Sequence, residues 1–295
     1  MKDLSVYYGN RRGIHHVNLS VAAGEVFGFL GPNGAGKTTA IRVLLDIIRP
    51  SSGKAAIFGL DCQKDGVKIR RKVGYIPGEL SLYRNQTAHE YFKMVNAVRG
   101  KTTDPVYLQN LCDRLELDPR HQMRTYSRGN KQKIGLVAAF MGKPDLLILD
   151  EPTSGLDPLI QQHVLSLVRE TRADGRTVFL SSHVLSEVQA ICDRVGIIRE
   201  GQIIATEQVE RLIRSQIHRL SLHFERMPPE GAFEFSGARE IIRTNQVITL
   251  EIQKNLNQVL SQAVEYGVVD LEDHPVTLEE VFLAYYGKKA GYHHG

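Results

Sequence analysis

The sequence predicts an α/β fold built on a parallel β-sheet. Three short apolar runs, at 26–30, 146–149 and 177–180, have the length and composition of buried parallel strands. The first run leads into the glycine-rich stretch GPNGAGKTT at 31–39, and apolar residues then recur at helical spacing over 40–48. A strand, a glycine-rich turn and a helix in this order indicate a functional site at the carboxyl edge of the sheet.

The glycine-rich stretch has the composition of a phosphate-binding loop. Gly31, Gly34 and Gly36 have no Cβ, so the chain can turn tightly and direct several N–H groups inward at the start of a helix. Lys37 supplies a positive charge for the β- and γ-phosphates, and Thr38 supplies a hydroxyl for Mg²⁺. A chance match to G-x-x-x-x-G-K-[ST] in a surface turn is the alternative, which the flanking strand and helix disfavour. The other loop residues expected to contact a nucleoside triphosphate are Pro32, Asn33, Ala35 and Thr39.

Two acidic residues follow the second apolar run. Asp150 and Glu151 stand at the carboxyl end of a predicted strand, where open α/β sheets bind their ligands. Asp150 suits the Mg²⁺ shell, and Glu151 is close enough to orient a water molecule and accept its proton. The two acids could instead only cap the following segment, but Pro152 favours a fixed turn there.

A histidine and a second polar loop complete the predicted site. His183 follows the third run, where a neutral imidazole could hydrogen-bond the γ-phosphate and the activated water; a purely structural histidine is the alternative. Ser127 and Gly129 precede an apolar helical stretch and would form a second anion site at its N-terminus. Because one nucleotide does not need two such helix ends, we expect the second to serve the nucleotide of a neighbouring molecule.

Composition excludes several classes of protein. The chain has 295 residues, 42% of them hydrophobic, and a net charge of +4, which suits a globular protein and is weak for a nucleic-acid binder. Cys62, Cys112 and Cys192 are far apart, which disfavours a thiol metal site and fits a reducing cytosol. The longest apolar stretch is far shorter than the ~20 residues that span a bilayer, so we expect a soluble chain whose membrane role requires a partner.

In order and spacing, these motifs resemble those of the ATP-binding cassette (ABC) ATPases. GPNGAGKT resembles the Walker A loop, LLILDE the Walker B segment with its catalytic glutamate, and YSRGNKQ the LSGGQ signature. SGLD at 154–157 resembles the D-loop, His183 the switch histidine, and Tyr8 the aromatic residue that stacks on adenine. The resemblance covers about residues 1–215.

The resemblance implies a P-loop NTPase (RecA-like) core and the cofactors ATP and Mg²⁺. Lys37, Glu151 and His183 would act in hydrolysis, and Thr38 and Asp150 would hold the metal ion. Two cassettes would pair head to tail, and a homodimer would have two equivalent composite sites in which each signature closes over the partner's ATP. The residues that would contact this ATP from the signature and the D-loop are Ser127, Gly129, Asn130 and Asp157.

The chain departs from the family pattern at three places. Gly78 stands where the family has the Q-loop glutamine and removes the side chain that would sense the metal ion, although Glu79 could partly substitute. Arg128 and Asn130 replace the usual glycine and glutamine of the signature. The segment before DLS is so brief that either the first edge strand is short or the chain starts upstream of Met1.

We expect two domains. Residues 1–215 would form the nucleotide-binding domain, with an antiparallel β subdomain and a helical signature subdomain over about 80–142. Thr87 and Glu90 form a capping box that opens a helix within this subdomain. Residues 216–295 would form a small α+β domain that resembles the C-terminal extension of ABC exporter ATPases.

The C-terminal region has its own periodicity. Residues 219–224 and 247–252 alternate apolar and polar side chains, as half-buried strands do. An amphipathic helix is predicted from residue 256 and ends at Gly267. A final helix is predicted over 277–287, with an apolar stripe that we interpret as core packing.

The predicted function is that of the ATP-hydrolysing subunit of a membrane ABC transporter. It would act at the cytoplasmic face of the membrane and power a separate permease that docks near residues 76–95. PGELSLY followed by YSRGNKQ resembles bacterial multidrug and toxin exporters, which favours export of a drug, antibiotic, peptide or lipid. The alternative is an ABC protein that acts on ribosomes or DNA without a permease, but such proteins usually carry two cassettes or long insertions. A kinase is disfavoured because it needs no signature loop.

Overall fold

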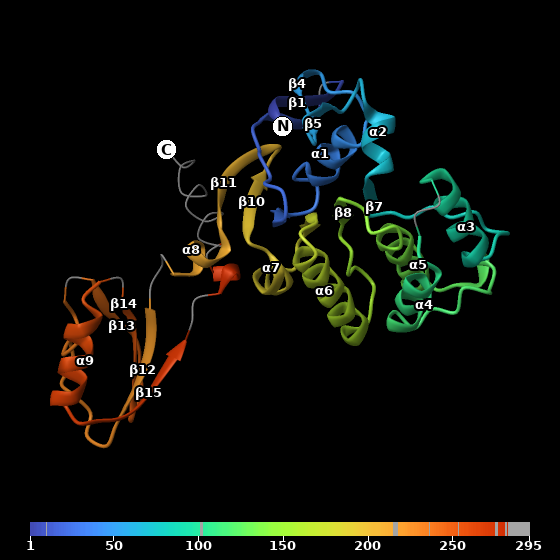
Figure 1. Cartoon of the computed structure of the whole chain (residues 1–295). Helices are drawn as coiled ribbons and strands as arrows, with labels where there is room; N and C mark the ends of the chain where they lie inside the picture. The colour runs from blue at the N-terminus through green and yellow to red at the C-terminus, as the bar shows by residue number, and fades with distance from the viewer. Residues whose placement is uncertain are drawn as a thin grey trace. The chain divides into compact units, whose positions relative to one another are not determined.

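The structure is a computed structural model that describes residues 1–9, 11–100, 103–214, 218–235, 237–252, 254–274, 277–280 and 282. The chain divides into two units, Met1–Glu207 and Gln208–Gly295 (Figure 1). This division lies ahead of helix α8 (Val209–Arg214). The predicted functional domains, 1–215 and 216–295, stay a prediction.

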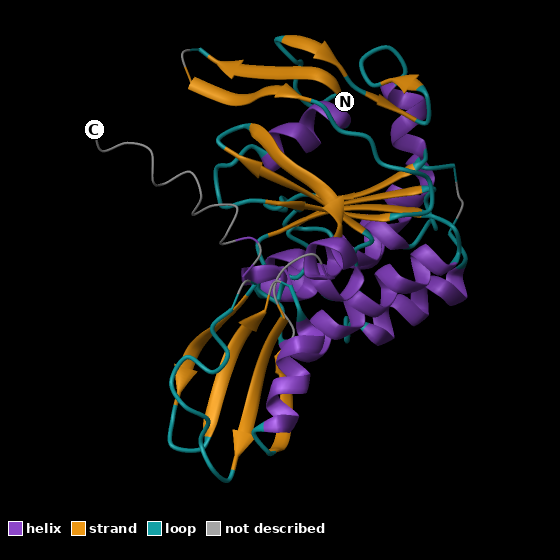
Figure 2. Ribbon diagram, turned by 90° about the vertical axis from the view of Figure 1, so that its left-hand side faces the viewer, coloured by secondary structure: helices purple, strands orange, loops and turns teal. Residues whose placement is uncertain are grey.

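A six-stranded sheet organises the first unit. Its strands are β3 (Val26–Leu30), β7 (Val73–Ile76), β8 (Leu146–Asp150), β9 (Thr177–Ser182), β10 (Arg194–Arg199) and β11 (Gln202–Gln208). The order is β11-β10-β3-β9-β8-β7, and every pair from β10 to β7 is parallel. The three predicted strands β3, β8 and β9 are buried along their whole length. They read as continuous apolar runs because helices cover both faces of the sheet (Figure 2).

Short antiparallel strands form a second layer of this unit. They are β1 (Lys2–Tyr8), β2 (Arg11–Val17), β4 (Ser52–Lys54), β5 (Ala56–Ile57) and β6 (Leu60–Asp61). The first three form a sheet of order β2-β1-β4, and β5 pairs with β6. Strand β1 has seven residues and pairs with both β2 and β4, so it is the central strand of this sheet and not an edge strand.

Helices connect and cover these sheets. They are α1 (Lys37–Leu44), α2 (Gly66–Arg71), α3 (Ala88–Val98), α4 (Pro105–Arg114), α5 (Arg128–Phe140), α6 (Pro158–Ala173) and α7 (Leu185–Ile191), with a 3₁₀ turn η1 (Met123–Thr125). Helix α1 contacts β2 and β8 and therefore packs between the antiparallel layer and the central sheet. Helix α3 begins at the predicted capping box: Thr87 Oγ1 accepts from the Glu90 N–H at 3.2 Å, and Glu90 accepts from the Thr87 N–H at 2.8 Å. None of the helices in the described ranges is both long and apolar enough to cross a membrane.

The second unit is a small α+β structure. Its strands β12 (His218–Phe224), β13 (Ala238–Arg243), β14 (Val247–Ile252) and β15 (Val268–His274) form an antiparallel sheet of order β13-β14-β12-β15. Helix α9 (Leu256–Glu265) packs on this sheet through the buried side chains of Val259 and Ala263. Both predicted strands and the amphipathic helix are therefore confirmed. The predicted helix over 277–287 lies mostly outside the described residues, although Leu278 is described and is buried.

Aromatic packing joins the two central strands of the first unit. The ring of Phe179 on β9 lies between Phe27 and Phe29 of β3, with centroid distances of 5.8 and 5.5 Å. All three side chains are at most 3% exposed. This packing holds together the strands that lead to the glycine loop and to His183.

We expect Phe179→Ala to lower the free energy of unfolding of this unit by about 3–5 kcal/mol, because it leaves a cavity in a fully packed core. Phe58→Ala is the matched control, since Phe58 is 47% exposed. Chemical denaturation followed by circular dichroism measures both variants. Equal losses in the two variants would contradict the assignment of Phe179 to the core.

Candidate functional site

The parallel register brings three segments to one edge of the sheet. Strand β9 lies between β3 and β8, with Leu30 opposite Ser182 and Asp150 opposite Ser181. The glycine loop, the two acids and His183 therefore leave neighbouring strands at the same level. This is the edge where parallel α/β sheets bind their ligands.

The glycine loop opens the N-terminus of α1. Gly34 and Gly36 have φ angles of +81° and +109°, which strain any residue with a Cβ. Gly36 precedes the first helical residue, Lys37, and no side chain caps the helix there. The N–H groups of the first turn and the helix dipole are thus left to favour an anion.

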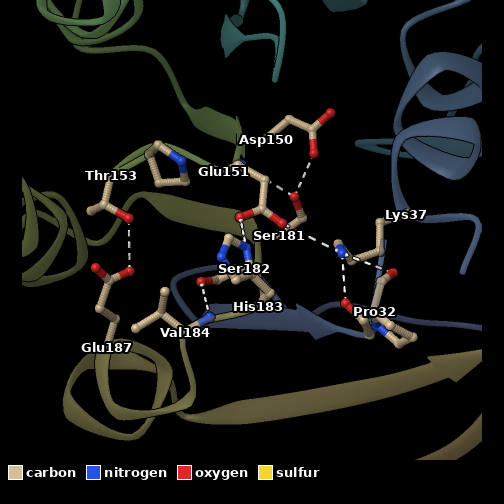
Figure 3. Close-up of polar contacts among 12 residues, drawn as sticks. Pro32, Lys37, Asp150, Glu151, Thr153, Ser181, Ser182, His183, Val184 and Glu187 are labelled. Carbon is tan, nitrogen blue, oxygen red and sulfur yellow. Dashed lines mark hydrogen bonds and ion pairs between the residues drawn. The ribbon is translucent and has the colours of Figure 1, made fainter. Parts of the chain in front are cut away.

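Lys37 is folded back onto this loop (Figure 3). Its Nζ donates to the carbonyl oxygen of Gly31 at 2.6 Å and to that of Pro32 at 3.3 Å. The same Nζ lies 3.4 Å from Glu151 Oε1, and the lysine side chain is only 6% exposed. A buried ammonium held by two carbonyls and one carboxylate is positioned to exchange these partners for phosphate oxygens.

Asp150 is buried and held by two hydroxyl groups. Thr38 Oγ1 donates to Asp150 Oδ2 at 2.8 Å, and Ser181 Oγ donates to Asp150 Oδ1 at 2.5 Å. The Asp150 side chain is 1% exposed. A carboxylate and a hydroxyl in contact are the oxygen donors that Mg²⁺ prefers, so these residues fit that ion.

Glu151 joins the loop to His183. Its Oε2 lies 2.5 Å from His183 Nδ1, and its backbone N–H donates to the Ser181 carbonyl at 3.1 Å. Within the described residues its Oε1 takes part in no hydrogen bond. The carboxylate therefore has one oxygen on the imidazole and one directed toward Lys37, with capacity to accept a further hydrogen bond.

A cavity of about 440 Å³ lies over these groups. The residues that line it are Tyr8, Arg12, Gly13, Pro32, Asn33, Gly34, Gly36, Lys37, Thr38, Thr39, Asp150 and Glu151. The Tyr8 ring rests against Gly13, where a Cβ would come within 2.9 Å of it, and Tyr8 Oη lies 3.5 Å from Thr39 Oγ1. An aromatic platform at one end and a cationic loop at the other fit a nucleoside triphosphate. Gly31 and Ala35 belong to the loop but do not line the cavity.

Four further predicted contact residues also lie outside the lining of this cavity: Ser127, Gly129, Asn130 and Asp157. Ser127 caps α5 by accepting from the Asn130 N–H at 3.2 Å, and its side chain is exposed. Asp157 caps α6 by accepting from the Ile160 N–H at 3.0 Å, and this bond lowers the pKa of Asp157. Gly129 packs on the D-loop, because a Cβ there would lie 2.9 Å from the Gly155 carbonyl. The structure therefore does not bring the signature to this chain's own loop.

The structure shows where two of the departures from the family pattern, Gly78 and Arg128, lie. A Cβ at Gly78 would lie 3.4 Å from Asp150 Oδ2, so this backbone passes directly beside the carboxylate. Glu79 is exposed and does not line the cavity, and its role stays a prediction. Arg128 is exposed.

Several residues of the site were not predicted. Arg12 and Gly13 line the cavity, and Ser181 binds Asp150. Gln132 Nε2 donates to the carbonyls of Glu151 and Pro152 at 3.2 and 3.1 Å. The sequence offered a signal for Ser181, a small polar residue directly after the apolar residues of β9, but none for Gln132, which lies between Lys131 and Lys133.

Comparisons with known proteins agree with this geometry. The family model described as "ABC transporter" matches residues 14–154. The bacitracin transport ATP-binding protein BcrA of Bacillus licheniformis is 38% identical over 212 residues, which cover 68% of this chain and 67% of BcrA. The lantibiotic transport ATP-binding protein SrtF of Streptococcus pyogenes is 34% identical over 224 residues, 74% of this chain and 96% of SrtF.

A solved structure supports the same conclusion for the fold. The structure titled as the ATP-binding subunit of an ABC transporter superposes with a TM-score of 0.67 at 30% identity, covering 72% of this chain and 90% of that one. The α/β class with a P-loop core is therefore confirmed. The chain belongs to the ABC transporter family and is an ATPase of the ATP-binding cassette type.

Proposed function

We propose that the chain is the ATP-hydrolysing subunit of a membrane exporter and works on a separate permease at the cytoplasmic face of the membrane. The observation that carries the proposal is the contact network at the sheet edge. It links Lys37, Glu151 and His183, and it places the Thr38–Asp150 pair beside them. In this proposal residues 1–215 act as the nucleotide-binding domain, with about 80–142 as its helical subdomain, and 216–295 act as an accessory domain.

The residues of this network have distinct roles in the proposal. Thr38 and Asp150 hold Mg²⁺, and Lys37 leaves its carbonyl partners to bind the β- and γ-phosphates. When bound, the metal ion neutralises charge on the phosphates. Glu151 accepts the proton of the attacking water, and His183 orients the Glu151 carboxylate through their 2.5 Å contact.

A second cassette completes the site. The cavity lined by the glycine loop does not include the signature and D-loop residues Ser127, Gly129, Asn130 and Asp157. We propose that they close over the ATP of a second copy in a head-to-tail homodimer, which gives two equivalent composite sites. The exposure of Ser127 at the N-terminus of α5 supports this role.

The permease is proposed to dock beside α3. A groove of about 570 Å³ there is lined partly by Tyr83, Met94 and Val98, of which Tyr83 is 62% and Val98 75% exposed. Arg70 and Arg99 add positive charge to the groove. We propose that a short amphipathic helix from a cytoplasmic loop of the permease is the occupant, because exposed apolar side chains in a cationic groove suit such a helix.

The names of two relatives support a proposal about the direction of transport and the cargo. BcrA and SrtF carry names that describe transport of bacitracin and of a lantibiotic. We therefore propose outward transport of an antimicrobial or similarly amphiphilic compound. The cargo contacts are assigned to the permease.

Glu151→Gln is expected to lower kcat by ~10²-fold or more, because the amide does not accept a proton, while ATP binding persists. Phosphate release measures turnover, and a fluorescent ATP analogue measures binding. Glu200→Gln is the control on an exposed carboxylate of the same unit. Unchanged turnover in Glu151→Gln would exclude Glu151 as the base.

Ser127→Asp tests the shared site. Aspartate retains the cap of α5, but its charge repels the triphosphate of the partner copy. We expect loss of hydrolysis when Ser127→Asp is the only change, measured by phosphate release. We also expect loss of ATP-driven dimerisation in the Glu151→Gln background, measured by light scattering. ATP affinity of the single chain should stay within about twofold of the parent, and a collapse of that affinity would contradict a site shared between copies.

Val98→Asp tests the docking groove. A charged side chain in place of the Val98 contact is costly to bury against the apolar face of the permease helix. We therefore expect the permease to be lost when the tagged chain is purified from detergent-solubilised membranes. ATP hydrolysis by the isolated chain should be unchanged. Val106→Asp is the matched control, because Val106 is 68% exposed on α4 and does not line the groove. Retention of the permease by Val98→Asp would place docking elsewhere.

A further inference from the structure

A hydrogen bond connects the turn after the two acids to helix α7. Thr153 Oγ1 donates to Glu187 Oε2 at 2.8 Å (Figure 3). Thr153 is 4% exposed and Glu187 is half-buried. Neither residue lines the nucleotide cavity.

This bond forms one half of a two-point attachment. His183 and Glu187 lie four residues apart, in the segment that enters α7 and its first turn. His183 Nδ1 contacts the Glu151 carboxylate at 2.5 Å, while Glu187 accepts from Thr153. Two side chains of one short segment thus hold two positions of the turn over 151–154.

The turn requires such restraint because its first residue has an unfavourable backbone. Glu151 has a φ angle of +54°, a region that residues with a Cβ rarely occupy unless their surroundings enforce it. The Ser181 carbonyl accepts the Glu151 N–H at 3.1 Å, and Gln132 donates to the Glu151 carbonyl at 3.2 Å. Both contacts act on the backbone of Glu151 itself, whereas the Thr153 bond acts on the far side of the turn.

The charges of Glu151 and His183 act on the Glu187 carboxyl group. Burial raises the pKa of Glu187, and the charge of Glu151 raises it further. The Thr153 hydrogen bond and the charge of His183 act in the opposite direction. A half-buried carboxylate close to a second carboxylate is energetically unfavourable unless it accepts a hydrogen bond, which Thr153 donates here.

We propose that Glu187 is a positioning residue for ATP hydrolysis, and that its bond to Thr153 holds the turn that aims the Glu151 carboxylate. The proposal rests on the proposed role of Glu151 as the general base. In this role Glu187 does not contact the nucleotide and acts only through Thr153. Loss of the bond lets the turn relax, so that the carboxylate loses its alignment while the phosphate loop is unaffected.

The test compares variants that remove the bond with variants that keep it. Thr153→Val and Glu187→Ala remove it, whereas Thr153→Ser and Glu187→Gln keep a donor and an acceptor. We expect the first two to lower kcat by roughly 10- to 100-fold, because small misplacements of a catalytic group have effects of that order. KM for ATP and the affinity for a fluorescent ATP analogue should change by less than about twofold, and the second two variants should retain most of kcat.

A double variant and a matched control separate positioning from general stability. Thr153→Val combined with Glu187→Ala should be no slower than the slower single variant, because both remove the same bond. Ser166→Ala removes a comparable hydroxyl–carboxylate bond, of 3.1 Å to Glu170 on an exposed part of α6, and should not alter kcat. Thermal unfolding of each variant shows whether it is folded at the assay temperature.

The outcomes distinguish this inference from the function on which it rests. Full activity in folded Thr153→Val, with Glu151→Gln inactive, would overturn the role of Glu187 and leave the base assignment intact. Additive losses in the double variant, or failure of Thr153→Ser to rescue, would also overturn it. Full activity in Glu151→Gln would instead refute the proposed base.

Discussion

The site depends on one constraint, the parallel pairing of β3, β9 and β8 in fixed register. Leu30 lies opposite Ser182, and Asp150 lies opposite Ser181. The segment after β3 therefore leaves the sheet beside two segments that lie more than 100 residues later in the sequence. The stacked rings of Phe27 and Phe179 secure this register from within the core. A slip of one residue would move every side chain to the opposite face of the sheet and separate the glycine loop from the acids.

Charge is distributed in the site so that each buried ionic group has a partner. Asp150 is satisfied by two hydroxyl groups, and Lys37 by two carbonyls and by Glu151. His183 contacts the second oxygen of the same glutamate. These groups form a chain from the phosphate loop to α7, and Glu187 extends it through Thr153. A change at the phosphate loop is thereby connected to the turn and to the helix that follows His183.

The cavity of a single chain is lined by only some of the residues that are predicted to contact ATP. The platform, the loop and the two acids share one cavity, whereas Ser127 and Asp157 cap helices outside it. Gly129 packs so closely on Gly155 that the signature and the D-loop form one surface. In the dimer that we propose, a second copy uses this surface of the first unit, and the groove beside α3 is a separate surface that we propose for a permease helix.

Features that depend on local chemistry could be predicted from the sequence. Buried apolar runs predicted β3, β8 and β9, Thr87 and Glu90 predicted a helix start, and the spacing from Gly31 to Thr38 predicted the loop. These signals lie within a few residues of the structure they specify, because hydrogen bonds of caps and turns are local.

The contacts between groups far apart in the sequence became visible in the folded structure. Ser181 with Asp150, Gln132 with the carbonyl of Glu151, and Thr153 with Glu187 are pairs that no local pattern specifies. Tertiary packing also brought Gly13 against the Tyr8 ring and left Ser127 outside the cavity. The physical reason is that such contacts depend on strand order, on register and on how helices pack over the sheet, and these arise from the whole core rather than from neighbouring residues.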